Sequence, residues 1–339
     1  MLIFLFALTR IVLNFKNKRR QKRTDRINQL LNSIIENPDL LDNEMTAYFN
    51  QSIIEFILSY EKFERNNRGF REWQRINSII SNQVFKIQVK PLARSSYWLK
   101  RYLAVRSMQL GEHIEAENIL VDLLNDKILL VSMNAAMVVL DNPTSTLINE
   151  MINVFSQEKQ NLRLITMNIL SSQPIKQDER IASIILKRLQ REQNVYCKIV
   201  CYDFLVLLSP LGEIDPIVKK DLLTDNVNLK IAILKFIFHS DPSGCKQLLI
   251  DNLDNPQEEV RTIVVKLLGK TGDESMIPYI KSKLSDKTWW VRINSANALG
   301  SLGKEGILAL QSISSQDDKF AYETAQAYLA NVTVKREIL

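Results

Sequence analysis

The stretch DNPQEEVRTIVVKLLGKTGDES at 254–275 is followed by DKTWWVRINSANALGSLGKEG at 286–306, and the two share one pattern. Aligned at Val260 and Val291, both continue with Arg and carry apolar or small residues four, five and eight positions later. Positions 0, 4, 5 and 8 lie on one face of a helix with 3.6 residues per turn. Each stretch therefore predicts an amphipathic helix.

Capping signals mark the ends of these helices. Asn255 suits an N-cap and Pro256 a first helical position, while Asp286 and Thr288 are both N-cap candidates for the second helix. The Gly that closes each apolar run, Gly269 or Gly300, suits a left-handed helix end. A second apolar run follows each Gly, so the repeated unit is predicted to be helix, turn, helix.

The same register extends along most of the chain, with equivalent positions 30 to 35 residues apart and a basic residue after position 0 in most units. Two-helix units at such a period are typical of α-solenoids, because stacked neighbours bury the apolar face that one pair leaves open. Position 0 falls at Leu99, Val131, Leu162, Cys197, Leu229, Val260, Val291 and Ala321.

The pattern D-x-x-x-x-V-R-x-x-x-A-x-x-L-G, followed by a second helix of the x-x-I-P-x-I kind, resembles HEAT repeats of the short type found in phycobilisome lyases. The motif is strong at 254–306, whereas at 96–253 the period alone carries the prediction. The resemblance implies an all-α fold, an α-solenoid of HEAT-like helix pairs (an armadillo-type alpha-alpha superhelix). It does not imply lyase activity, because many binding proteins share repeat architectures.

The segments outside the repeats are predicted from composition and register. Residues 27–95 have helical spacing without the repeat register, which is typical of the atypical units that cap a solenoid. The predicted segments are a hydrophobic membrane-anchor helix at 1–15, a basic juxtamembrane segment at 16–26, a helical N-terminal cap at 27–95, the HEAT-like solenoid at 96–332 and a tail at 333–339.

The N-terminal run MLIFLFALTRIVLNF precedes the basic run KNKRRQKR. As a helix it spans about 22 Å, which is short for a hydrocarbon core of about 30 Å. A secretory signal would carry basic residues before the apolar run and a small-residue cleavage site after it, and neither is present. We expect a membrane anchor whose positive flank keeps the solenoid on the cytoplasmic side; a helix packed on the solenoid is the alternative. The anchor residues are Leu2, Ile3, Phe4, Leu5, Phe6, Leu8, Ile11, Val12 and Leu13, and the basic topology signal is Lys16, Lys18, Arg19, Arg20, Lys22 and Arg23.

The net charge of +6 is concentrated at the N-terminus. Residues 1–26 carry +7, so the rest of the chain sums to −1. A solenoid without a basic excess lacks the bulk charge that marks a phosphate-binding face. We therefore expect no nucleic-acid partner.

Residues suited to catalysis or metal binding are scarce. The two histidines, His113 and His239, lie more than a hundred residues apart. The chain therefore offers few ligands for a zinc site and few bases for a Ser-His-Asp triad. One HEAT family, deoxyhypusine hydroxylase, uses iron held by His-Glu pairs, which this chain lacks. We predict no catalytic residue, no metal and no cofactor. Cys197 and Cys201 fall at positions 0 and 4 and are expected to be small buried residues.

The resemblance implies that the helix carrying position 0 lines the concave side, with positions 2 and 6 facing outward. The residues there form a stripe whose middle is apolar enough to accept an apolar helix of a partner. A register error of one residue would make them core residues instead. Trp289 and Trp290 fit a partner contact or packing between repeats, because Tyr97 and Trp98 occupy corresponding slots. The partner-binding candidates are Arg101, Met133, Met137, Leu164, Ile199, Asp203, Ile231, Lys235 and Trp289.

These observations predict a membrane-tethered, non-catalytic scaffold or adaptor that binds a protein partner on its concave face. The chain resembles bacterial HEAT-repeat proteins with an N-terminal membrane segment, which suggests a membrane enzyme as the partner. One alternative is a lyase-type or chaperone-like accessory subunit of an enzyme. The other is a soluble protein-binding solenoid whose N-terminal helix belongs to the fold.

Overall fold

The structure is a computed structural model, and it describes residues 2–37, 40–111, 116–157, 179–208 and 216–337. Regular structure in these residues is entirely helical, as predicted for an α-solenoid. The chain divides into two compact units, residues 1–154 and 155–339, and each is described by itself.

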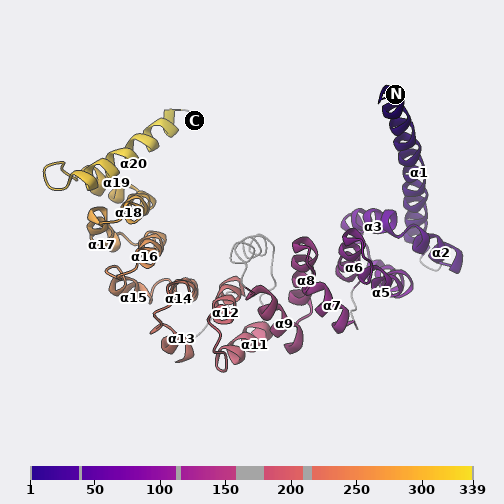
Figure 1. Ribbon diagram of the computed structural model, residues 1–339, viewed down its shortest axis with the longest axis horizontal. Helices are drawn as coiled ribbons and strands as arrows, with labels where there is room; N and C mark the ends of the chain where they lie inside the picture. Colours follow the sequence, from indigo (N-terminus) through magenta and orange to yellow (C-terminus); the bar gives the residue numbers. More distant parts are fainter. Residues whose placement is uncertain (1, 38–39, 112–115, 158–178, 209–215, 338–339) are drawn as a thin grey trace. The chain divides into compact units, whose positions relative to one another are not determined.

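The first unit begins with α1 (Leu2–Glu36), one continuous helix through the predicted anchor, the basic segment and the start of the predicted cap (Figure 1). The later turns of α1 pack against α3 and bury Ile27, Leu31 and Ile34. No helix in the described part of the chain is both long enough and apolar enough to cross a bilayer. The other elements are α2 (Asn43–Gln51), α3 (Ile53–Asn67), α4 (Trp73–Ile80), a π-helix (Ser81–Phe85), α5 (Lys86–Ala93), α6 (Trp98–Leu110), α7 (Glu117–Leu124), α8 (Leu129–Asp141) and α9 (Ser145–Phe155).

An aromatic cluster forms the core beneath α2 to α5. The ring of Tyr60 lies 5.6 Å from that of Phe56 and 5.1 Å from that of Phe85, while Trp73 is 6.0 Å away. The hydroxyl of Tyr60 donates a hydrogen bond to Asn77 at 2.7 Å, which satisfies the polar end of a fully buried ring. These residues therefore form a hydrophobic core in a part of the chain whose sequence lacks the repeat pattern.

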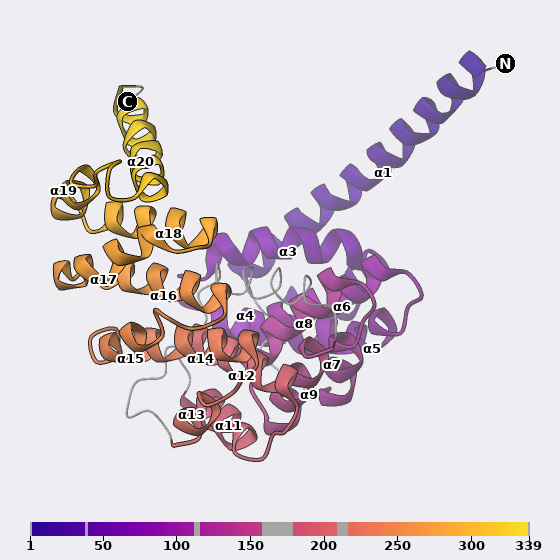
Figure 2. The ribbon, with the colours of Figure 1, turned by 60° about the vertical axis from the view of Figure 1, so that its left-hand side comes forward.

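The second unit is a stack of helix pairs. One row contains α12, α14, α16 and α18, which contact each other in sequence and continue to α20 (Figures 1 and 2). Position 0 lies on this row, and Cys197, Leu229, Val260, Val291 and Ala321 are all buried in it. The elements are α11 (Glu179–Leu189), α12 (Val195–Leu208), α13 (Pro216–Asp221), α14 (Val227–Ser240), α15 (Lys246–Asp251), α16 (Glu258–Lys270), α17 (Ile277–Ser282), α18 (Trp289–Ser301), α19 (Lys304–Gln311) and α20 (Lys319–Glu337), with 3-10 turns at Glu274–Met276 and Lys283–Ser285.

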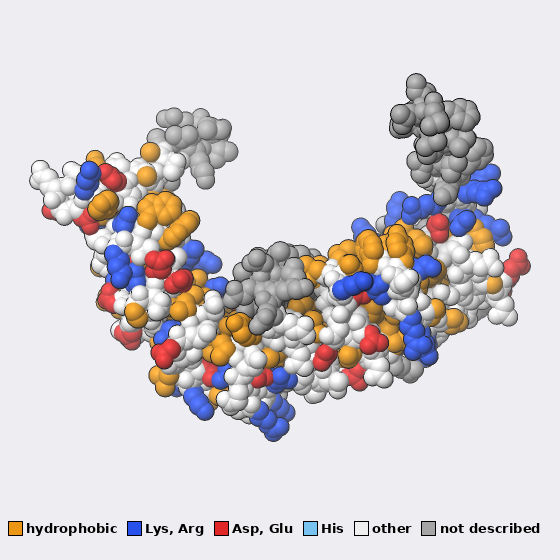
Figure 3. All heavy atoms as spheres, viewed as in Figure 1, with side chains coloured by type: hydrophobic (Ala, Val, Ile, Leu, Met, Phe, Trp, Pro, Cys, Tyr) orange, Lys and Arg blue, Asp and Glu red, His pale blue; other side chains and the backbone are white. Residues whose placement is uncertain are grey.

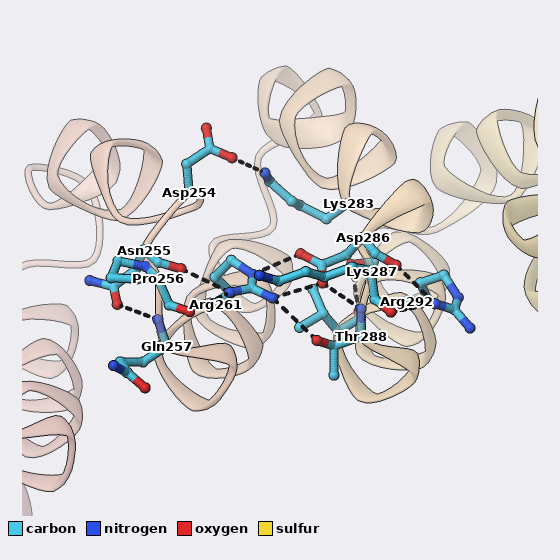
Figure 4. A network of polar contacts seen from close by, with 12 residues as sticks. Asp254, Asn255, Pro256, Gln257, Arg261, Lys283, Asp286, Lys287, Thr288 and Arg292 are labelled. Atoms are coloured by element: carbon cyan, nitrogen blue, oxygen red, sulfur yellow. Dashed lines mark hydrogen bonds and ion pairs between the residues drawn. The ribbon is translucent and has the colours of Figure 1, made fainter.

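The basic residue after position 0 joins one helix pair to the next. Arg261 donates to both carboxylate oxygens of Asp286, and its third nitrogen donates to the carbonyls of Asn255 and Pro256 (Figure 4). Both ion-pair partners are buried, with side chains 5% and 7% exposed. The arginine therefore closes the start of its own helix and fixes the start of the next repeat.

The same geometry corrects the register of the first repeat. Arg101 donates to both carboxylate oxygens of Asp126 and to the carbonyls of Ser95 and Ser96. These are the sequence offsets that Arg261 uses, so Arg101 is its equivalent and position 0 is Lys100 rather than Leu99. The prediction placed this repeat one residue too early, because the sequence there offers two adjacent basic residues.

The two glycines that close the apolar runs have another role than the predicted one. Gly269 and Gly300 lie inside α16 and α18, and among the described residues the glycines with positive φ are Gly272 (66°) and Gly303 (78°). A Cβ on Gly269 would lie 2.7 Å from the Cβ of Ala298 on the neighbouring helix. The small residue is therefore required for close helix packing, and the left-handed turn comes three residues later.

Candidate functional site

Several predicted partner-binding residues lie in the core or in the repeat junctions. Met133 and Ile199 are 8% and 2% exposed, which corrects their assignment to an outward stripe. Arg101 is held by Asp126 and is also not a surface residue. Position 2 is thus buried in α8 and α12, so it is not uniformly the outward position that the stripe assumed.

Position 6 supplies most of the accessible residues. Lys235 is exposed, and Met137, Asp203 and Ile231 are partly exposed. Leu164 lies outside the described residues. The outward stripe is therefore narrower and more polar than predicted.

A groove runs across α12, α14, α16 and α18, with a cavity volume of about 470 Å³. We call it the row groove. Its apolar lining includes Val206, Phe238, Ile263 and Leu267, and its polar lining includes Lys235, His239, Lys266, Lys270, Asn297 and Ser301.

The polar lining of the row groove follows the repeat. Lys235, Lys266 and Asn297 are spaced 31 residues apart, and so are His239, Lys270 and Ser301. These two sets of residues lie one helical turn apart, because residues four positions apart lie on the same face of a helix. The three lysines are exposed, and within the described residues none of them forms an ion pair. No acidic side chain is among the described residues that line this groove.

A second cavity of about 460 Å³ lies between α18 and α20. We call it the aromatic pocket. Trp289, Phe320 and Tyr328 line it, together with Arg292 and Glu323. The guanidinium of Arg292 lies 5.3 Å from the centre of the Phe320 ring, a cation–π contact. Hydrophobic side chains gather over α18, with basic ones nearby (Figure 3).

The tryptophan pair is exposed rather than packed between repeats. Trp289 is 52% and Trp290 59% exposed, and their rings meet edge to face at 4.6 Å. The interpretation of this pair as a packing element is therefore wrong. In the corrected register Trp98 is the equivalent of Trp289, so the recurrence reflects a shared slot on the surface.

The row groove and the aromatic pocket meet at Asn297, which lines both. Together they make one continuous surface on α12, α14, α16, α18 and α20. Of this surface the sequence indicated Lys235 and Trp289. Position 6 of the predicted stripe also falls on Lys266. Lys270, Phe320 and Tyr328 were missed, although the 31-residue step from His239 could have indicated Lys270.

The three cysteines lie within the helix packing of the second unit. Cys197, Cys201 and Cys245 are buried, as predicted for the first two. Burial raises the pKa of the Cys201 thiol to about 12 and that of Cys245 to about 11. In the described part of the chain no three His, Cys, Asp or Glu side chains come together as a metal site. His113 lies outside the described residues.

Comparison with known proteins identifies the repeats. A family model for HEAT repeats matches residues 247–330. This region holds α16 to α19 and most of α20, the part in which the motif is strongest. The matched residues, which lie in the second unit, thus carry HEAT repeats. A search of the curated proteins gives no match.

The solved structures that match this chain have low sequence identity and low TM-scores. The CpcE–CpcF complex of phycocyanin lyase from Nostoc is 15% identical, with a TM-score of 0.34, covering 67% of this chain and 92% of that one. YibA of E. coli is 16% identical, with a TM-score of 0.38, covering 78% and 97%. Human deoxyhypusine hydroxylase is 16% identical, with a TM-score of 0.30, covering 76% and 98%. At such low TM-scores these likenesses do not bear on the activity of this chain.

Proposed function

We propose that the protein is a non-catalytic scaffold that binds a protein partner on the surface formed by the aromatic pocket and the row groove. The observation that carries this proposal is the group of exposed aromatic side chains beside the pocket: Trp289, Trp290 and Phe320 are 52%, 59% and 62% exposed. Large exposed apolar groups next to a cavity mark interaction sites, and tryptophan is enriched among the residues that dominate binding energy.

The rigidity of the repeats supports this use of the surface. Arg261 and Arg292 hold the starts of α16 and α18 through several hydrogen bonds each. Binding to a preformed surface costs less ordering entropy than binding to a mobile one. The aromatic pocket is therefore a suitable anchor point for one large side chain of a partner.

The experiment that tests this function is affinity capture with matched tryptophan variants. The double variant Trp289→Ala and Phe320→Ala removes the aromatic walls, whereas Trp98→Ala removes a tryptophan at the equivalent slot in the first unit. We expect the first variant to lose at least tenfold of a captured protein partner and the second to retain it. Equal capture by all three proteins, with circular dichroism showing that all are folded, would reject the proposed site.

We also propose that α1 tethers the scaffold to the cytoplasmic side of a membrane. The support is local charge: Lys18, Arg19, Arg20 and Lys22 are exposed in succession along α1, so their charges face solvent on every side of the helix. Juxtamembrane basic residues contribute about 1 kcal/mol each near an anionic surface. The apolar residues 2–13 would then enter the bilayer, with the basic residues at its cytoplasmic surface.

Vesicle flotation tests the tether separately from partner binding. Full-length protein is mixed with phosphatidylcholine vesicles, with and without phosphatidylserine. Replacement of Lys18, Arg19, Arg20 and Lys22 by Glu should abolish the preference for phosphatidylserine, while the turns of α1 that pack on α3 stay intact. Flotation that is unchanged by these substitutions, or absent with both lipids, would show that the basic segment is not a tether.

A further inference from the structure

We propose that the row groove holds an acidic amphipathic helix of the protein partner, next to the side chain that the aromatic pocket anchors. This inference rests on the proposed function and specifies the chemistry of the partner segment. The segment carries carboxylates for Lys235, Lys266 and Lys270, and apolar side chains for the floor between them.

The first argument is charge. Lys235, Lys266 and Lys270 are exposed on adjacent helices, and within the described residues they have no ion-pair partner. Other lysines of this unit do have one: Lys198 lies 2.5 Å from Asp221, Lys246 lies 2.5 Å from Asp273 and Lys283 lies 2.5 Å from Asp254. Exposed lysines outside the groove, such as Lys219, Lys220 and Lys304, also have no ion pair among the described residues, but Lys235, Lys266 and Lys270 line one groove that has no acidic lining residue. A partner of opposite charge is steered to such a patch and held in register by it.

The second argument is spacing. Lys235 and Lys266 are equivalent residues on neighbouring helices, and packed helices lie about 8–10 Å apart. Lys266 and Lys270 are one turn apart on one helix, a separation of about 6 Å. In a helix laid across the row, carboxylates seven residues apart are separated by about 10.5 Å. Acidic residues at i and i+7 would therefore meet Lys235 and Lys266, and a third on the flank of the segment nearer the end of α16 would meet Lys270.

The third argument is the floor of the groove. Val206, Phe238 and Ile263 are each partly exposed and line the space between the lysines. A purely polar acidic segment would leave these apolar groups facing charge. A helix with an apolar stripe buries them, which is the usual way in which an amphipathic helix fits a groove. At Asn297 the groove continues into the aromatic pocket, so one segment reaches both.

A protein segment fits this surface better than a nucleic acid does. The described lining of the row groove contains three lysines and one histidine and no arginine, whereas nucleic-acid-binding proteins typically contact about 6–10 phosphates. Arginine forks are the preferred partners of phosphate. A phosphate backbone also has no apolar side chains that could pack against the floor of the groove. The observations therefore favour a peptide.

The test is a selection of helical peptides from a displayed random 20-residue library against the full chain. The same selection is run against Lys235→Glu, Lys266→Glu, Lys270→Glu as a triple variant, and against Lys219→Glu, Lys220→Glu, Lys304→Glu as a control. The control changes net charge equally, and its three lysines are exposed on α13 and α19, outside the groove. Affinity for selected peptides is then measured in competition with a 20-nucleotide oligouridylate.

We expect peptides selected on the wild-type chain and on the control to be enriched at least threefold in Asp and Glu. Their affinity should fall at least tenfold on the groove variant. An absence of acidic enrichment, equal binding by the groove variant, or lysine-dependent binding of oligouridylate that is tighter than that of any peptide would each overturn the inference. If capture of a partner depends on Trp289 and Phe320 while the peptides show no acidic preference, the proposed function stands and only this inference fails.

Discussion

Arg261 and Asp286 form a bidentate ion pair between successive HEAT repeats, with nitrogen–oxygen distances of 2.7 and 2.9 Å. The backbone N–H of Thr288, the residue just before α18, donates to the same carboxylate at 2.8 Å, so Asp286 also fixes the turn that leads into this helix. One buried pair thus sets both the spacing of the repeats and the start of α18. The equivalent pair of Arg101 and Asp126 shows that this junction recurs in the first unit.

Arg261→Ala should destabilise the second unit strongly. The substitution leaves the buried carboxylate of Asp286 without its partner, and breaking a buried pair from one side costs about 3–5 kcal/mol. Urea unfolding followed by circular dichroism measures the effect. Arg65→Ala is the control, because its pair with Glu61 is 3.8 Å long and its side chain is 73% exposed; we expect a change below about 1 kcal/mol there. Equal costs for both variants would show that the junction pair is not the dominant contact.

Stability should fall in acid because of the junction carboxylates. Burial alone would raise the pKa of Asp286, but hydrogen bonds from Arg261 and from the Thr288 amide, with the charge of Arg261, outweigh it and leave the pKa lowered. A lowered folded-state pKa contributes stability that is present above the unfolded value of about 3.9 and is lost as pH falls through the folded value. Asp126 has a lowered pKa for the same reasons.

Chemical denaturation at a series of pH values tests this expectation. Midpoints should be level near neutrality and drop below about pH 4. Asp286→Asn removes one of the groups concerned, so its acid-induced loss should be smaller than that of the wild type, although it starts from a lower stability. A wild-type profile that is flat down to pH 3 would contradict the assignment.

Gly269→Ala should loosen the contact between α16 and α18. The added methyl would lie 2.7 Å from the Ala298 Cβ and 2.8 Å from its Cα, and the latter belongs to a backbone that cannot turn away. Overpacking of this kind costs about 1–3 kcal/mol. Gly69→Ala is the matched control, because its Cβ would have no atom within 4 Å. Hydrogen exchange in α18 measures the difference, and protection unchanged from wild type in Gly269→Ala would refute the close-packing role.

The fold was predictable because each repeat has a recognisable pattern of apolar residues within a short stretch of sequence. The apolar periodicity of 254–306 gave the helix pairs, and the 31-residue spacing extended them. Gly269 shows the limit of such reasoning: a Gly after an apolar run is typical of a helix end, yet here the adjacent helix decides its role. Contacts across helices override a local signal of this kind.

The binding surface was harder to predict than the fold. Lys235 was identified from its position, but Met133 and Ile199 were placed outward although the structure buries them. Helix periodicity specifies which residues share a face, and it does not specify how wide the buried arc is when a helix has neighbours on three sides. The aromatic pocket was missed because Phe320 and Tyr328 line it from α20, and the register that places α20 beside α18 does not specify which side chains leave a cavity between the two helices.

The three cysteines should be unreactive in the folded protein. The thiolate is the species that attacks a disulfide reagent, and a pKa of about 12 for Cys201 leaves about one thiolate in ten thousand at pH 8. For Cys245, with a pKa of about 11, the fraction is about one in a thousand. Cys197, Cys201 and Cys245 are 7%, 0% and 4% exposed, so a reagent also lacks access.

Labelling with 5,5′-dithiobis(2-nitrobenzoic acid) in native buffer should therefore proceed only as fast as the second unit opens. Leu223→Cys, at a position 82% exposed, adds a thiol that reacts at once and verifies the assay. In urea all three native thiols should react. A native thiol that labels as fast as the added one would show that α12 or the start of α15 opens far more readily than its packing implies.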